Sequence, residues 1–152
     1  MRHGQATPAE QDADRPLSPA GRAAIERVAW RAGAAKLRPD MIYHSDLLRA
    51  EQTAEILARH LGVSGRRQPR EGLRPDDAVP PVVDWLLEEG GQGRSIALVG
   101  HLPFLNRLAS LLVVGQPEPE LLDFEPGALV KLRSNGAEGP FAVSWMLAPG
   151  VV

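Results

Sequence analysis

The chain has 152 residues, with 17 Lys and Arg against 19 Asp and Glu, a formal net charge of -2 and no cysteine. This length suits one domain, residues 1–152, that can bury a core of its own. The near-balanced charge excludes a general attraction to nucleic acid or to an anionic membrane surface, so any recognition of anions has to be local. The lack of cysteine excludes disulfides, thiolate metal sites and cysteine nucleophiles.

The chain shows no apolar run near the roughly 18 residues that a membrane span needs, and no basic-then-apolar signal peptide at its start. It contains no internal repeat and no low-complexity tract, which also fits a single domain. We therefore expect a cytoplasmic protein that does not enter a membrane. We also expect a monomer.

The first half of the chain predicts two helices and one strand. The segment 15–37 indicates a loop followed by a helix, because Ser18 can cap the helix and Pro19 suits its first turn. An apolar run at 40–45 then predicts a short strand, and residues 46–63 predict a second helix that ends at a glycine. One face of the first helix is apolar, at Ile25, Val28, Ala29 and Ala32.

The next part of the chain alternates helices and strands again. Residues 66–81 are rich in Pro, Arg and Asp, which is typical of an exposed connection with one brief edge strand. Residues 82–89 predict a third helix, and residues 102–115 predict a fourth. Between these helices, the apolar run at 95–100 is bounded by turn residues, as expected for a buried parallel strand.

The last part of the chain predicts a β-hairpin. Residues 128–133 and 141–147 alternate well enough to be strands, and the turn-rich loop 134–140 joins them. Strands that alternate with helices indicate an α/β domain, a three-layer αβα sandwich with a mostly parallel central sheet. In such open sheets, ligands bind beyond the carboxyl ends of the strands, where strand ends meet helix starts.

Histidine and arginine residues follow the predicted strands at this edge. His101 comes directly after one strand, and Arg49 lies about one turn into the helix that follows another. Ser45, between that strand and its helix, is interpreted as a helix cap because no nucleophile elbow surrounds it. If the RHG triplet also follows a strand, Arg2 and His3 join them at the same edge.

Such a cluster of positive charge requires an anion, because like charges that are desolvated together repel one another. A phosphoryl group suits it, since arginine forks match its oxygens and a helix N-terminus adds backbone N–H groups. An imidazole with a pKa of about 6.5 is available as a free base and can act as a nucleophile at neutral pH. Each residue also has an ordinary structural explanation, and only their joint arrangement favours a site.

Four motifs occur in order along the chain: RHG at 2–4, RPLSPAG at 15–21, HSDLLRAEQTA at 44–54 and VGHLPFL at 99–105. This set resembles the histidine phosphatase superfamily, also called phosphoglycerate mutase-like, and within it the SixA-type phosphohistidine phosphatases. The resemblance runs from residue 1 to about residue 113. The remaining residues match only in their strand pattern.

The resemblance implies a metal-independent phosphatase without a cofactor. His3 would accept the phosphoryl group, and water would then release it. The phosphoryl oxygens would be bound by Arg2, Arg49 and His101, and by Arg15, which matches an additional phosphate-binding arginine. The reaction would consist of two in-line displacements through a phosphohistidine, with charge stabilisation providing most of the catalysis.

Two parts of the family pattern lack a clear counterpart. Larger relatives protonate the leaving oxygen with a carboxylic acid from the connection at 70–78, where Glu71, Asp76 and Asp77 are the candidates. Family members also carry an apolar strand before RHG, at the centre of the sheet. Met1 occupies the last position of that strand, so either the strand is encoded upstream, which we favour, or the sheet lacks it.

For the substrate, size and resemblance favour phosphohistidine on a phosphotransfer protein. A chain of this length has little material for a lid over a small sugar phosphate, and an imidazole leaving group needs less acid assistance than an alkoxide. Two alternatives stay open. One is a small-molecule phosphomonoesterase that acts on phosphate esters on the same scaffold, and the other is a non-catalytic module that binds phosphate or a phosphoprotein.

Overall fold

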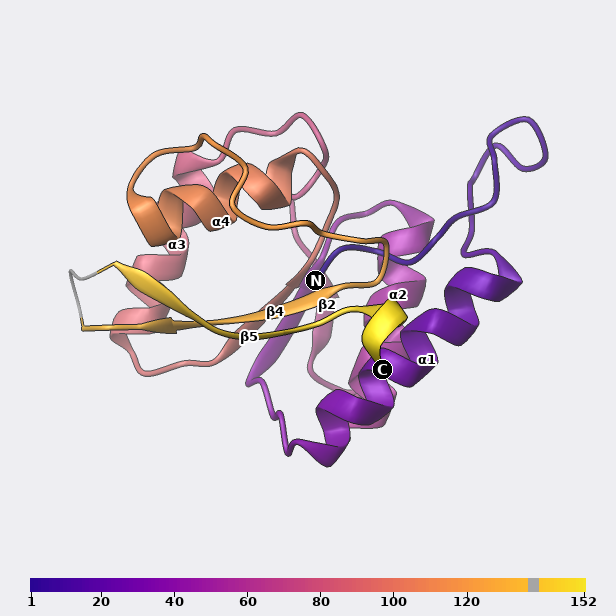
Figure 1. Ribbon diagram of the computed structural model, residues 1–152, viewed down its shortest axis with the longest axis horizontal. Helices are drawn as coiled ribbons and strands as arrows, with labels where there is room; N and C mark the ends of the chain where they lie inside the picture. The colour runs from indigo at the N-terminus through magenta and orange to yellow at the C-terminus, as the bar shows by residue number, and fades with distance from the viewer. Residues whose placement is uncertain (137–139) are drawn as a thin grey trace.

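Helices and strands alternate along the chain in the computed structural model, which describes residues 1–136 and 140–152 (Figure 1). No helix in these two stretches has both the length and the apolarity that crossing a membrane requires. In chain order the elements are α1 (Pro19–Ala34), β1 (Met41–His44), α2 (Leu48–Leu61), β2 (Arg67–Pro69), α3 (Pro80–Gly91), β3 (Ile96–Val99), α4 (Phe104–Val114), β4 (Leu129–Ser134), β5 (Phe141–Leu147) and a 3-10 turn at Pro149–Val151.

The strands form two small sheets in the middle layer. Strands β2, β1 and β3 make a parallel sheet in that order, with Met41 opposite Ile96. Strands β4 and β5 make an antiparallel pair. Successive side chains of a strand point to opposite faces, so Ile42 packs in a cluster with α1 and α2, while Tyr43 packs with residues of α3 and α4. This is the predicted three-layer α/β architecture.

The start of α1 and the end of α2 follow local sequence signals. The hydroxyl of Ser18 accepts a hydrogen bond from the Gly21 N–H at 3.0 Å, and proline takes the first position of α1. The predicted apolar stripe of α1 is buried against α2. α2 ends at Gly62, which adopts the left-handed conformation that glycine tolerates without steric cost. α3 begins two residues earlier than predicted, because Pro80 and Pro81 fit a first helical turn.

The predicted hairpin and the brief edge strand are both present. Leu129 pairs with Leu147 and Ser134 with Phe141, and the register between β4 and β5 shifts once along the way. The edge strand within the long connection is β2, which pairs with β1. Residues 137–139 of the predicted hairpin loop lie outside the described residues.

One strand has a different environment from the one predicted. The sequence predicts that β3 is buried, yet Ile96, Ala97 and Leu98 are only half-buried. A cavity of about 200 Å³ lies between β3 and β4, lined by residues 96–98 and 129–132 together with apolar side chains of α4. β3 is therefore the last strand of the parallel sheet on that side, and strand edges of this kind carry backbone groups without a partner strand.

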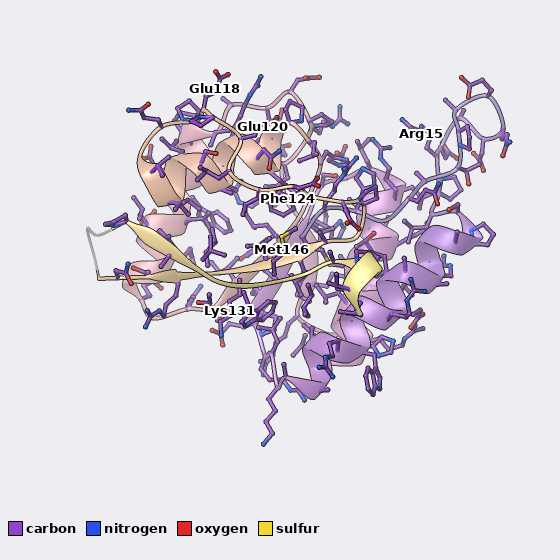
Figure 2. The ribbon with its side chains drawn as sticks, in the orientation of Figure 1. Arg15, Glu118, Glu120, Phe124, Lys131 and Met146 are labelled. Carbon is purple, nitrogen blue, oxygen red and sulfur yellow. The ribbon has the colours of Figure 1, made fainter. Side chains whose placement is uncertain are left out.

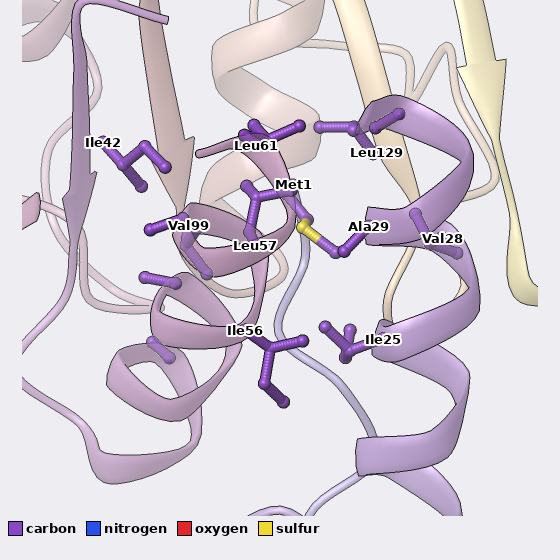
Figure 3. Close-up of a cluster of buried hydrophobic side chains, with 14 of the residues drawn as sticks. Met1, Ile25, Val28, Ala29, Ile42, Ile56, Leu57, Leu61, Val99 and Leu129 are labelled. Carbon is purple, nitrogen blue, oxygen red and sulfur yellow. The ribbon is translucent and has the colours of Figure 1, made fainter. Parts of the chain in front are cut away.

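The first residues of the chain occupy one end of this cavity. The Met1 amine donates to the Leu98 carbonyl at 2.7 Å, and the Met1 carbonyl accepts from the Gly100 N–H at 3.1 Å. On the other side, the Arg2 N–H donates to the Ala128 carbonyl at 3.0 Å. Figure 3 shows the Met1 side chain in the core between α1 and α2, and burial lowers the pKa of the Met1 amine to about 5. This short segment joins the two sheets.

Candidate active site

Backbone contacts on two sides hold His3 at the end of β3. Its N–H donates to the Gly100 carbonyl at 3.0 Å, and its carbonyl accepts from the Gly127 N–H at 3.0 Å. The residue after His3 is glycine for a steric reason, because a Cβ at Gly4 would lie 2.8 Å from Ile25 and 2.9 Å from Leu17. The close packing on α1 and the pairing with the sheet together fix the backbone of the RHG triplet.

The His3 ring is arranged as a nucleophile. Its Nδ1 lies 2.6 Å from the Gly4 carbonyl oxygen, and because a carbonyl only accepts hydrogen bonds, Nδ1 carries the proton. Burial lowers the pKa of His3 to about 4; the bond to Gly4 opposes this shift, and the charges of Arg49 and Arg2 add to it. The ring is therefore neutral at physiological pH, and Nε2 presents its lone pair.

Two arginine side chains at the site have free hydrogen-bond donors. Arg2 Nη1 donates to the Phe124 carbonyl at 2.7 Å, while the Nε atoms of Arg2 and Arg49 are buried and have no partner among the described residues. Burial lowers the pKa of both guanidinium groups. Both charges also lower the pKa values of His3 and His101, so they act on both imidazoles. Both arginines are half-buried, and a buried Nε–H without a partner favours an anion as that partner.

His101 faces His3 across this site. The two ring centroids are 4.8 Å apart, with the planes tilted by 51°. Burial, followed by the effect of His3, lowers the pKa of His101 to about 3. His101 Nδ1 is buried and, like the two arginine Nε atoms, has no partner in the described part of the chain. The candidate site therefore contains three buried nitrogen atoms without a partner in the described residues.

Arg15 lies farther out than the other predicted phosphate-binding residues. It belongs to the loop before α1, which projects from the body of the molecule (Figure 1, Figure 2). Its side chain is exposed, and its Nε donates to the Thr7 carbonyl at 3.5 Å. Its charge still lowers the pKa values of His3 and Arg49. Arg15 therefore acts on the site through its charge, from an exposed position.

The three candidate acids are engaged elsewhere or face solvent. Asp77 accepts a hydrogen bond from the Arg74 N–H at 2.7 Å. Glu71 and Asp76 are exposed. Across residues 1–136 and 140–152, no hydrogen bond or ion pair joins any of the three carboxylates to the imidazoles of the site. A role for them as general acid stays a prediction.

A different carboxylate acts on the site. The charge of Asp46, which follows β1, raises the pKa of His101. Asp46 accepts two hydrogen bonds from the Arg74 guanidinium, at 2.9 and 2.5 Å. This pairing lowers the pKa of Asp46. Asp46 is therefore a carboxylate at neutral pH and not a proton donor.

The interpretation of Ser45 as a helix cap is not supported by its contacts. α2 begins at Leu48 without a side-chain cap, and the Ser45 hydroxyl lies 3.4 Å from the Leu47 nitrogen. It lies much closer, at 2.5 Å, to Nε2 of His101. Sequence reasoning missed this contact, because the two residues are brought together only by the pairing of β1 with β3.

Sequence reasoning also missed Thr53, which connects two parts of the site. Its buried hydroxyl accepts a hydrogen bond from the Gly4 N–H at 3.1 Å and donates to the Arg49 carbonyl at 2.7 Å. The helix that carries Arg49 is thereby tied to the RHG triplet. The spacing of the two residues could have indicated this contact, because Thr53 follows Arg49 by four residues and so lies about one helical turn away on the same face.

The low pKa values predict how the site responds to acid. An unfolded histidine titrates near pH 6.5, whereas His3 and His101 in the native site titrate at about 4 and about 3. Between about pH 6.5 and 4 the unfolded chain binds more protons than the native chain, so the free energy of unfolding falls as the pH is lowered through this window. NMR titration of the ring protons should show His3 neutral down to about pH 5. A His3 midpoint near 6.5 would contradict this environment.

Comparisons with known proteins identify the class to which this fold belongs. The family model for the histidine phosphatase superfamily (branch 1) matches residues 1–74. An uncharacterized protein of Picosynechococcus sp. (strain ATCC 27264 / PCC 7002 / PR-6) is 34% identical over 128 residues, which cover 84% of this chain and 76% of that protein. The structure of the protein histidine phosphatase SixA complexed with tungstate is 26% identical, with a TM-score of 0.87 over 99% of this chain and 95% of that chain.

A mycobacterial glucosyl-3-phosphoglycerate phosphatase shares the fold at 19% identity, with a TM-score of 0.69 over 94% of each chain. The chain therefore belongs to the histidine phosphatase superfamily, a class of phosphatases, and its structure is SixA-like. This agrees with the resemblance carried by the four sequence motifs.

Proposed function

We propose that this protein hydrolyses phosphohistidine on a phosphotransfer protein, with His3 as the nucleophile. The observation that carries the proposal is the neutral His3 ring beside three buried nitrogen atoms without a partner in the described residues, in Arg2, Arg49 and His101. The likeness to the protein histidine phosphatase SixA supports it, because that structure holds tungstate, an anion with the tetrahedral shape of phosphate.

The reaction proceeds in two displacements at phosphorus. In the first, the Nε2 lone pair of His3 forms a bond to phosphorus while the bond from phosphorus to the leaving nitrogen breaks. The Nδ1–H of His3 stays bonded to the Gly4 carbonyl, which stabilises the positive charge that develops on the ring. In the second, water attacks phosphorus and the bond to Nε2 breaks, so that His3 returns to its neutral form. One proton of the water stays on the departing inorganic phosphate and the other passes to solvent.

Positive charge stabilises both transition states. The free Nε–H groups of Arg2 and Arg49 would donate to the oxygens of the transferring group, and donors of this kind act strongly where water is excluded, as it is around these buried Nε atoms. Arg15 adds positive charge from the projecting loop, which helps to attract a phosphorylated partner.

The state of Asp46 favours a phosphorus–nitrogen bond in the substrate. An alkoxide leaving group needs a proton donor, and Arg74 holds Asp46 in the ionised form. An imidazole leaves as a neutral ring when its other nitrogen carries a proton, since the pKa of its conjugate acid is only about 6.5. A site of this kind therefore serves phosphohistidine better than a phosphate ester.

The substrate profile tests this proposal. We expect kcat/KM for a phosphorylated histidine phosphotransfer domain to exceed that for p-nitrophenyl phosphate and for 3-phosphoglycerate by at least about tenfold, a difference of about 1.4 kcal/mol in transition-state stabilisation. Faster hydrolysis of either ester would overturn the phosphohistidine assignment and favour a small-molecule phosphomonoesterase. Hydrolysis of none of them would overturn the enzyme and favour a phosphate-binding module.

A further inference from the structure

We propose that Ser45 is a positioning residue that sets the tautomer of His101. In this arrangement the Ser45 hydroxyl donates to Nε2 of His101 and keeps the proton of that ring on Nδ1, where it can bind a phosphoryl oxygen. The inference deepens the proposed function and rests on it for the identity of the anion.

The contact is built into the pairing of two strands. Ser45 directly follows β1, and its N–H donates to the Val99 carbonyl at the end of β3 at 3.1 Å. This pairing places the Ser45 side chain beside His101, with Oγ and Nε2 2.5 Å apart. Each residue is only 1% exposed. Away from water, a hydrogen bond between groups held by two paired strands fixes both the orientation of the ring and the position of its proton.

The direction of this hydrogen bond follows from counting acceptors. Among the contacts of Ser45 Oγ in the described residues, only Nε2 of His101 can accept the hydroxyl proton, since the other is the Leu47 N–H, itself a donor, at 3.4 Å. If His101 donated from Nε2 instead, the serine proton would lack an acceptor. Nδ1 would then present a lone pair to the site, which repels phosphoryl oxygens. Donation by Ser45 avoids both costs.

The two imidazoles then share one tautomer and present opposite edges to the phosphoryl group. In His3, the Nδ1–H donates a hydrogen bond to the Gly4 carbonyl, and the free Nε2 attacks phosphorus. In His101, Nε2 accepts the hydrogen bond from the Ser45 hydroxyl, and the free Nδ1–H donates to a phosphoryl oxygen. Burial lowers the pKa of His101 to about 3, so the ring is neutral at physiological pH and carries one proton. The tautomer therefore decides which of its nitrogen atoms donates.

The wild-type protein itself provides the first test. The nitrogen-15 chemical shifts of a neutral imidazole distinguish a protonated from an unprotonated nitrogen, so NMR of labelled protein at neutral pH reports the tautomer of His101 directly. We expect a protonated Nδ1 in the wild type, and a shift toward protonated Nε2 in Ser45→Ala. A protonated Nε2 in the wild type would overturn the inference, whether or not the variant folds.

Binding of inorganic phosphate provides the second test. We expect Ser45→Ala to raise the Kd for phosphate about tenfold, the effect of weakening one hydrogen bond to a charged ligand. Ser110→Ala is the matched control, because that buried hydroxyl donates to the Pro119 carbonyl at 2.8 Å and not to a residue of the site. An unchanged Kd in Ser45→Ala would overturn the inference. A protonated Nδ1 in a protein that hydrolyses no phosphorylated substrate would support the role of Ser45 and overturn the proposed function.

Discussion

Replacing His3 with alanine should abolish hydrolysis, with kcat/KM lowered by at least about a thousandfold for any substrate that the wild type hydrolyses. The variant loses the Nε2 lone pair of His3, whereas Nε2 of His101 is bonded to Ser45. The backbone pairing of residue 3 does not depend on its side chain. We therefore expect a folded protein, which circular dichroism checks alongside steady-state release of phosphate.

His60→Ala is the control for this substitution. His60 lies in α2, and among the described residues its Nε2 contacts Glu26 on α1 and no residue of the site. We expect the control to keep turnover within about twofold of the wild type, because the contact that it removes lies between α1 and α2 and not at the site. Retention of more than about a tenth of the activity in His3→Ala would show that another group accepts the phosphoryl group.

An apolar strand added ahead of Met1 should raise the midpoint of thermal unfolding by at least about 5 °C. The cavity of about 200 Å³ between β3 and β4 has room for its side chains, and the edges of both strands can pair with it. An amide also replaces the buried Met1 amine. Because burial lowers the pKa of that amine to about 5, the native state loses stability as the pH falls from 8 to 5, by about 1 kcal/mol at pH 7.

The extension should be five residues of alternating Val, Leu and Ile, long enough to run alongside β3. A Gly-Ser extension of equal length is the control, because it removes the amine without adding apolar side chains. Differential scanning calorimetry of both variants separates the two effects. Equal melting temperatures for the two extensions would show that the cavity does not accept a strand.

Local signals explain how much of the fold could be predicted from the sequence. The Ser18 and Pro19 pair marks the start of α1, and Gly62 marks the end of α2, because capping and glycine conformation depend on a few neighbouring residues. The meeting of His3 and His101 follows from a general property of parallel sheets, whose strand ends share one edge.

Contacts between distant segments explain what could not be predicted. The contact of Ser45 with His101 spans 56 positions and the pairing of Asp46 with Arg74 spans 28, and both depend on register and rotamers that no local pattern encodes. The apolar sequence of β3 predicts a buried strand, but how far the strand is buried depends on which segment covers its edge. The sequence of the strand does not contain that information.

The location of the phosphoryl group during turnover tests the account most directly. The protein would be mixed with a phosphorylated histidine phosphotransfer domain, quenched in alkali, which preserves phosphohistidine, and digested for mass spectrometry. We expect a phosphoryl group on His3 that appears during turnover and disappears when the substrate is exhausted. A phosphoryl group on a different histidine of this chain, or hydrolysis without any phosphorylated His3, would contradict it.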